Sequence, residues 1–132
     1  MDLLDLTPKS DEIVVVIKHP ATGDTHQNND GTDMTITICA PHSKDYKKVL
    51  HEITNKRLKK MQSKGKNDVT AEELEEGSLE VLAKTTRAWN ITYDGESPKL
   101  TVTKAKEVYE RVFWIRSQIE GAIEDSLDFM KA

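Results

Sequence analysis

The pattern of apolar and polar positions divides the chain into an N-terminal part with strand character and a longer part with helix character. Residues 12–19 read Glu-Ile-Val-Val-Val-Ile-Lys-His, which is the clearest strand. Its centre is a run of β-branched apolar residues: Ile13, Val14, Val15, Val16 and Ile17. Such side chains favour strands over helices. Because both alternating sets of positions are apolar, the pattern predicts burial on both faces of this strand.

A second strand is predicted for residues 34–40, where apolar and polar side chains alternate. The apolar set is Met34, Ile36, Ile38 and Ala40, and the other set is Thr35, Thr37 and Cys39. Strict alternation is typical of a half-buried strand. Turn signals follow the first strand at His19-Pro20 and precede the second at Asp30-Gly31. We therefore expect an antiparallel hairpin, and a short additional strand near Thr25 is left open.

Two helices are predicted for the middle of the chain. Pro41 ends the second strand, and Ser43 is a candidate N-cap for a helix whose narrow stripe predicts exposure on most sides. That stripe is Tyr46, Val49, Leu50, Ile53, Leu58 and Met61. A linker rich in Lys and Gly follows near residues 63–69. Thr70 to Glu73 then forms a capping box, and the helix that begins there is expected to reach Trp89.

The C-terminal part predicts two further helices after the Asp94-Gly95 turn. Thr103 is a candidate cap for the first, and Phe113-Trp114 marks a bend or a continuous passage into the last. Gly121 costs that last helix roughly 1 kcal/mol relative to Ala, so we expect a close neighbour there. The predicted class is α+β, mainly α: an N-terminal β-hairpin followed by about four helices. A single domain spans residues 1–132, with leader and hairpin in 1–42 and a helical body in 43–132.

Composition narrows the class of protein. The 132 residues suffice for one domain with a core, and 36% are apolar while 32% are charged. No apolar run approaches the roughly 20 residues that a membrane span needs, and the acidic N-terminus is unlike a secretory signal. The single cysteine, Cys39, excludes an internal disulfide and fits a reducing cytoplasm. These features predict a protein that works without a membrane.

Charge is segregated along the chain, although the net charge is only −4. Residues 44–66 hold nine basic and two acidic side chains. Lys56, Arg57, Lys59 and Lys60 are the densest part, and we expect them to steer an acidic partner. A nucleic-acid-binding regulator that uses the basic helix 44–66 is an alternative, but the segment has a single aromatic residue and no recognition motif. A solvated helix face is the plainest interpretation.

The sequence contains no pattern that predicts catalysis, a cofactor or a metal. Cys39 and His42 have zinc-like spacing but no second pair, and the loop 26–37 lacks carboxylates at the first and twelfth positions of a calcium loop. No nucleophile elbow or phosphate-binding glycine loop is present. We therefore expect a protein that is not an enzyme and that has no cofactor.

Two apolar features are candidate partner or subunit interfaces. Trp89 and Trp114 most simply belong to the core, or one of them lines an apolar groove for a partner helix. A two-stranded sheet leaves both edges open, so the strand with Ile13, Val14, Val15 and Val16 needs cover. Helices or a second subunit would supply that cover, which leaves a homo-oligomer open.

Several short blocks, taken in order, resemble the tail assembly chaperones of long-tailed phages. They are His19-Pro20-Ala21-Thr22-Gly23 after an apolar strand with Asp24 in the family's acidic place, Ser43-Lys44-Asp45-Tyr46, Leu82-Ala83 with Trp89, Asp94-Gly95, Thr103, Ile115-Arg116-Ser117-Gln118-Ile119 and residues 122–129. The blocks span residues 12–130 in the expected order. The Asn-rich stretch 24–33 departs from the family's pattern.

The resemblance implies a non-enzymatic assembly factor in the host cell cytoplasm. Such proteins bind the long helical tape measure protein, keep it soluble and help recruit major tail (tube) protein subunits around it. They are typically absent from the mature virion. Many are also made in a longer, frameshifted form that recruits the tube protein, and residues 1–132 would then be the short form. A structural tail or head-completion protein retained in the virion is the other alternative.

Overall fold

The computed structural model describes residues 3, 11–64 and 71–128. Within these ranges the elements, in chain order, are β1 (Glu12–Val16), β2 (Thr35–Cys39), α1 (Lys44–Lys64), α2 (Ala71–Thr85), β3 (Thr86–Asn90), α3 (Val102–Arg111) and α4 (Trp114–Asp128). The fold is α+β and mainly α, as predicted. Helix α1 extends to Lys64, so residues 63 and 64 of the predicted linker are helical, while its residues 65–69 and the proposed Thr70 cap lie outside the described residues.

The predicted hairpin is confirmed, but it belongs to a larger sheet. β1 pairs antiparallel with β2, with Ile13 opposite Ile38, and β2 also pairs antiparallel with β3. The strand order is therefore β1-β2-β3. The prediction of helix up to Trp89 is wrong, because the helix ends at Thr85 and Trp89 lies opposite Ile36 in β3.

Strand β3 follows helix α2 directly, without a loop between them. The side chains of two threonines mark the end of the helix. The Oγ1 hydroxyls of Thr85 and Thr86 donate to the carbonyl oxygens of Val81 and Leu82, both at 2.8 Å. Threonine side chains that bond back to the preceding turn disfavour continuation of a helix. Thr86 is also 2.6 Å from the hydroxyl of buried Tyr109, which ties the start of β3 to α3.

The Asn-rich stretch is a structured extension of the hairpin. Bridges pair Lys18 with Thr25 and Gln27 with Asp33, so the extra pairing expected near Thr25 is an isolated bridge. Asn28 accepts from the Thr92 hydroxyl at 2.7 Å and donates to the Asn90 carbonyl at 3.2 Å. These bonds attach the extension to the end of β3.

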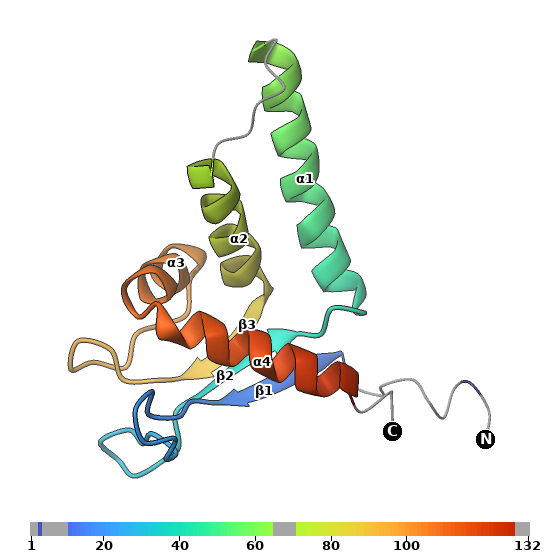
Figure 1. Ribbon diagram of the computed structural model, residues 1–132. Helices are drawn as coiled ribbons and strands as arrows, with labels where there is room; N and C mark the ends of the chain where they lie inside the picture. The colour runs from blue at the N-terminus through green and yellow to red at the C-terminus, as the bar shows by residue number, and fades with distance from the viewer. Residues whose placement is uncertain (1–2, 4–10, 65–70, 129–132) are drawn as a thin grey trace.

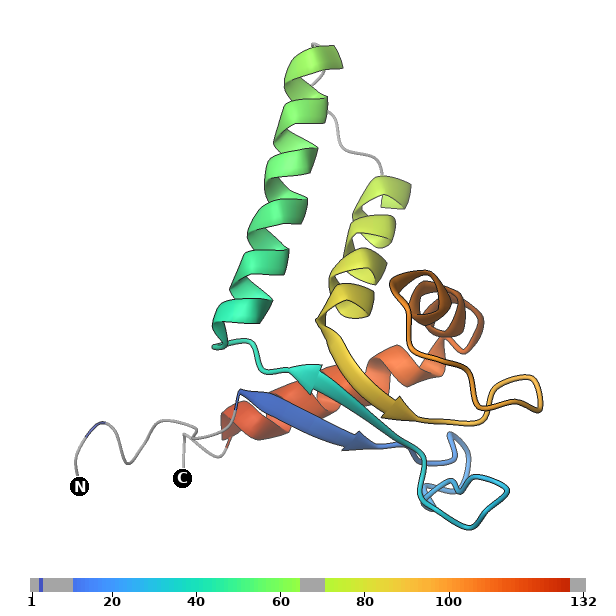
Figure 2. The same cartoon turned by 180° about the vertical axis from the view of Figure 1, so that it is seen from behind.

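One face of the sheet is covered and the other is open. Figure 1 shows α4 lying across the sheet, and in Figure 2 no described helix covers the opposite face. Val15 is buried, whereas the side chains of Val14 and Val16 are 62% and 39% exposed. The prediction of burial on both faces of β1 is therefore wrong, because helices pack on one side only.

The covered face, α2, α3 and α4 share one apolar core. Its fully buried members include Ile17, Ile36, Ile38, Val108, Tyr109 and Ile119. Gln118 on α4 also forms two hydrogen bonds with the backbone of Lys18, just after β1. Its side-chain amide donates to the Lys18 carbonyl at 2.7 Å and accepts from the Lys18 N–H at 2.8 Å. A side chain thus occupies the place of a neighbouring strand.

The helix boundaries correct some predictions and confirm others. Ser43 caps α1, since its Oγ accepts from the backbone N–H of Tyr46 at 3.1 Å. The cap of α3 is Thr101, which accepts from Lys104 at 3.0 Å, and not Thr103. Of the two alternatives left open at Phe113-Trp114, the structure has the interruption, since α3 ends at Arg111 and α4 begins at Trp114. A methyl group added at Gly121 would have no described atom within 4 Å, so the expected close neighbour is absent among the described residues.

Candidate partner interface

The predicted basic residues lie on the outer half of α1, where they face α2. The Nζ of Lys56 is 3.8 Å from Glu80, which also pairs with Lys84 at 3.4 Å. Arg57 lies against Gly77 of α2, where a methyl group would collide with its guanidinium. Glycine at that position therefore makes room for an arginine from the neighbouring helix.

The narrow groove between these helices is charged. Its volume is about 130 Å³, and it is lined by Ile53, Lys56, Arg57, Lys60, Glu73, Glu76, Gly77 and Glu80. Basic side chains come from α1 and acidic ones from α2. The sequence analysis expected these basic side chains to steer an acidic partner, and part of their charge instead faces acidic side chains of α2. Lys59 is exposed, so it remains open to a partner.

The two tryptophans lie apart from the basic residues and close to the core. Trp89 is half-buried, and its indole N–H donates to the carbonyl of Pro98 at 2.9 Å. Trp114 is half-buried at the start of α4, and both pack against the core cluster. The two indole rings therefore belong mainly to the packing of the core. The neighbouring aromatic residue Phe113 is exposed instead.

A larger, more apolar groove lies between α1, α2 and α4, over the end of β2. Its volume is about 300 Å³, and its lining is Ile38, Tyr46, Leu50, Ser78, Val81, Leu82, Thr85, Arg116, Glu120 and Ile123. Leu50 lies on its α1 side and is 41% exposed. Sequence reasoning missed this groove, because its lining comes from four elements.

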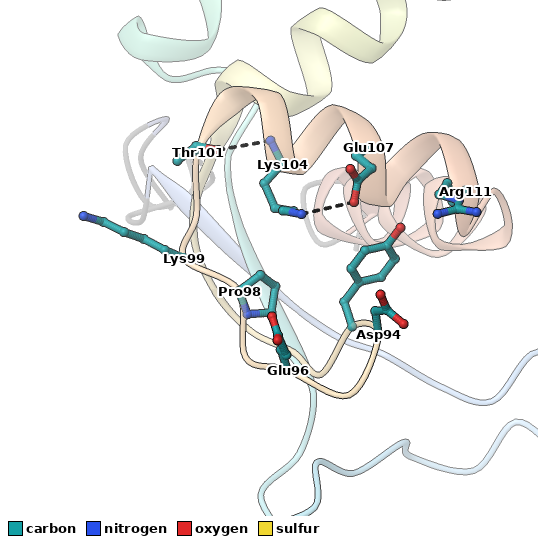
Figure 3. A pocket seen from close by; sticks show the side chains of 9 residues that line it. Asp94, Glu96, Pro98, Lys99, Thr101, Lys104, Glu107 and Arg111 are labelled. Carbon is teal, nitrogen blue, oxygen red and sulfur yellow. Dashed lines mark hydrogen bonds and ion pairs between the residues drawn. The ribbon is translucent and has the colours of Figure 1, made fainter.

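A further hollow is polar and lies between α3 and the loop before it (Figure 3). It has a volume of about 550 Å³ and is lined by Tyr93, Asp94, Glu96, Pro98, Lys99, Thr101, Lys104, Glu107 and Arg111. The Lys104 ammonium is 3.2 Å from Glu107 and lowers the pKa of that carboxyl. Acidic and basic groups are equal in number and mostly exposed, which is typical of a solvated surface.

No group of three or more His, Cys, Asp or Glu side chains suited to a metal gathers in the described ranges. Cys39 is buried, and its Sγ accepts from the Nε of Arg87 at 2.9 Å. The Nε2 of His42 is 3.4 Å from Asp11. The rings of His19 and His26 are 6.2 Å apart, and His19 Nδ1 accepts from the backbone of its own turn. The Cys39 thiol and the His19 ring therefore have structural partners, whereas the buried Nε2 of His42 makes no hydrogen bond with a described residue.

Comparison of the chain with models of protein families, with curated proteins and with solved structures gave no match. Within the described helices, none is long and apolar enough to cross a bilayer. The function must therefore be argued from the residues, from the resemblance of their order and from the geometry of the grooves.

Proposed function

We propose that this protein is a tail assembly chaperone of a long-tailed phage. In this proposal it binds the tape measure protein in the host cytoplasm, keeps it soluble and helps recruit tail tube subunits. The ordered blocks between residues 12 and 130 support the assignment. Several of them occupy positions that set the fold: Gly23 closes a turn onto His19 at 2.9 Å, and Ser43 caps α1. The resemblance is therefore one of fold-determining residues.

The observation that carries the proposal is the open apolar groove on a highly charged molecule. A protein that holds a long amphipathic helix in solution needs apolar surface that water tolerates while the partner is absent. It also needs a charged exterior to remain soluble with its cargo. The groove beside α1 and the 32% charged residues supply both.

The basic half of α1 has a separate role in this proposal. Lys56, Arg57, Lys59 and Lys60 raise the rate at which an acidic partner is captured, even though Lys56 and Arg57 already contact α2. Reversing all four charges to Glu is expected to slow association and to remove its salt dependence. Stopped-flow measurements at two salt concentrations test this, and unchanged association would exclude steering by these residues.

The decisive experiment is co-expression with the tape measure protein of the same phage. We expect the tape measure protein to move from the insoluble to the soluble fraction and to co-purify with the chaperone. Mass spectrometry of purified virions should then find the chaperone absent. A stoichiometric amount in the virion would instead identify a structural tail or head-completion protein.

The same preparation tests the nucleic-acid alternative. Lys44, Lys47, Lys48 and Lys59 make no ion pair with another described residue, which is the feature that favours it. A salt-dependent mobility shift with duplex DNA or RNA, together with failure to solubilise the tape measure protein, would replace the chaperone assignment by a regulator.

A further inference from the structure

The floor of the apolar groove is one stripe of α2. Ser78, Val81, Leu82 and Thr85 follow the i, i+3, i+4, i+7 spacing that places side chains on one face of a helix. Ser78 and Thr85 are small, and the hydroxyl of Thr85 is satisfied within α2. The stripe therefore offers a shallow surface against which another helix packs closely.

Charged side chains lie beside the groove on α1 and in its lining on α4, although Lys47 is not itself a lining residue. On α1, Lys47 lies one turn before Leu50, is exposed, and has no ion pair with another described residue. On α4, Glu120 is also exposed and unpaired in the described part, while Arg116 pairs with Glu75 at 3.8 Å. A helix in the groove would therefore have the Lys47 ammonium beside its α1 edge and the Glu120 carboxylate in its α4 wall.

The groove offers no free strand edge, and this favours a helical ligand over an extended one. Ile38, its contribution from the sheet, belongs to the central strand, whose neighbours β1 and β3 already pair with it. An extended segment would find no strand edge here and would bury unsatisfied backbone groups. A helix satisfies its backbone internally, so it enters an apolar groove walled by helices without that cost.

We propose that this groove binds one amphipathic helix whose apolar stripe is flanked by acidic residues toward α1 and by basic residues toward α4. The inference rests on the proposed function, since the helix would belong to the tape measure protein. It adds the site, the secondary structure and the charge pattern of the segment that binds. Leu50 and the floor of α2 supply the apolar contact, and Lys47 and Glu120 fix the rotation of the bound helix.

The test uses the full chain and a fluorescein-labelled peptide of roughly 20 residues, which is about 30 Å long as a helix. The peptide carries Leu at the i, i+3, i+4, i+7 positions, Glu along one flank and Lys along the other. Fluorescence anisotropy should show saturable binding to the wild-type chain. Leu50→Asp should weaken it by about tenfold or more. Leu74→Asp is the matched control, because Leu74 is a helical leucine of similar exposure, 48%, outside the groove.

A second pair of variants fills the groove without removing any apolar contact. Ser78→Phe places a ring on the floor and should reduce peptide binding as strongly as Leu50→Asp does. Ser117→Phe adds the same ring to an exposed serine of α4 that does not line the groove and should leave binding unchanged. Circular dichroism melting of each variant confirms that the fold is retained.

The outcomes separate this inference from the proposed function. If the wild-type chain solubilises the tape measure protein and folded Leu50→Asp and Ser78→Phe do so equally well, the groove is not the site. If the peptide binds in the groove but the tape measure protein stays insoluble, the chaperone assignment fails while the helix site stands. The inference is overturned if the wild-type chain does not bind the peptide, or if a second copy of the chain occupies the groove in a dimer.

Discussion

The sheet with α3 and α4 is held together by apolar contact, whereas the outer half of α1 is held against α2 largely by charge. Ile36 and Tyr109 in the first region have no exposed surface. In α1, Val49 and Ile53 are the buried apolar residues of the described part, and beyond them the contacts with α2 come from Lys56 and Arg57. Figure 1 shows the same division, since α1 extends away from the sheet.

This difference has an energetic meaning. Burying a large aliphatic side chain contributes about 1.5–3 kcal/mol, whereas an exposed ion pair contributes about 0–1 kcal/mol. The outer half of α1 is therefore expected to open at a much lower free energy than the sheet region. The charged groove that Lys56, Arg57 and Lys60 line can therefore change its width while the apolar core stays intact.

The largest expected effect contrasts an apolar side chain from each region. Ile36→Ala should lower the free energy of unfolding by about 2–5 kcal/mol, because it leaves a cavity in the packed sheet. Leu58→Ala on the outer half of α1, where the side chain is 50% exposed, should change it by less than about 0.5 kcal/mol. Urea unfolding measures both, and equal losses would contradict the division into two regions.

A smaller effect concerns the buried hydroxyl of the core. Burial raises the pKa of Tyr109 to about 12, and the hydrogen bond with Thr86 offsets part of that rise. Because the ordinary pKa is near 10, the stabilising contribution is complete below pH 10 and is lost as the pH rises toward 12. Tyr109→Phe should cost about 1 kcal/mol at neutral pH and should flatten the alkaline loss. Unfolding at a series of pH values compares the variant with wild type, and parallel curves would refute this role.

The two helical glycines, Gly121 and Gly77, allow a matched pair of Ala substitutions whose expected effects are of similar size to that of Tyr109→Phe. Gly121→Ala should stabilise the chain by about 1 kcal/mol, since the position is helical and no described atom lies nearby. Gly77→Ala gains the same helix propensity but displaces Arg57 from α2, so its net gain should be smaller. Thermal melts of the two variants measure the difference. Equal stabilisation would mean that the Arg57 contact contributes nothing.

The smallest effect belongs to the exposed ion pair between α1 and α2. Lys56→Ala should cost less than about 0.5 kcal/mol at low salt, and the difference from wild type should vanish near 1 M salt, where charges are screened. Hydrogen exchange of the outer amides of α1 should accelerate in the variant while amides of β2 stay unchanged. Equal acceleration in both regions would show that they open together.

The elements that the sequence predicts well are those with a local pattern. The alternation from Met34 to Ala40 and the cap at Ser43 both depend on neighbours within a few residues. The exposure of Val14 and Val16 was not predictable in this way, because it depends on which face of the sheet the helices cover. Thr101 and Thr103 are equally suitable caps by type, and contacts beyond the local sequence decide between them.

The third strand and the groove escape prediction for the same reason. Thr86 to Asn90 follows a helix directly, without the turn residues that usually separate the two kinds of element. Only pairing with β2 makes it a strand, as tertiary context often overrides local preference. The groove requires β2, α1, α2 and α4 to be placed together, and no single stretch of sequence contains that information.

The two hydrogen bonds between the Gln118 side chain and the Lys18 backbone join residues 100 positions apart. During synthesis on the ribosome, the hairpin that carries Lys18 emerges early, but the helix that covers it emerges last of the described elements. Val15, Ile17 and Ile38 therefore lack that cover until α4 has been synthesised. A protein proposed to protect another chain's apolar surface would itself pass through a stage in which its own needs protection.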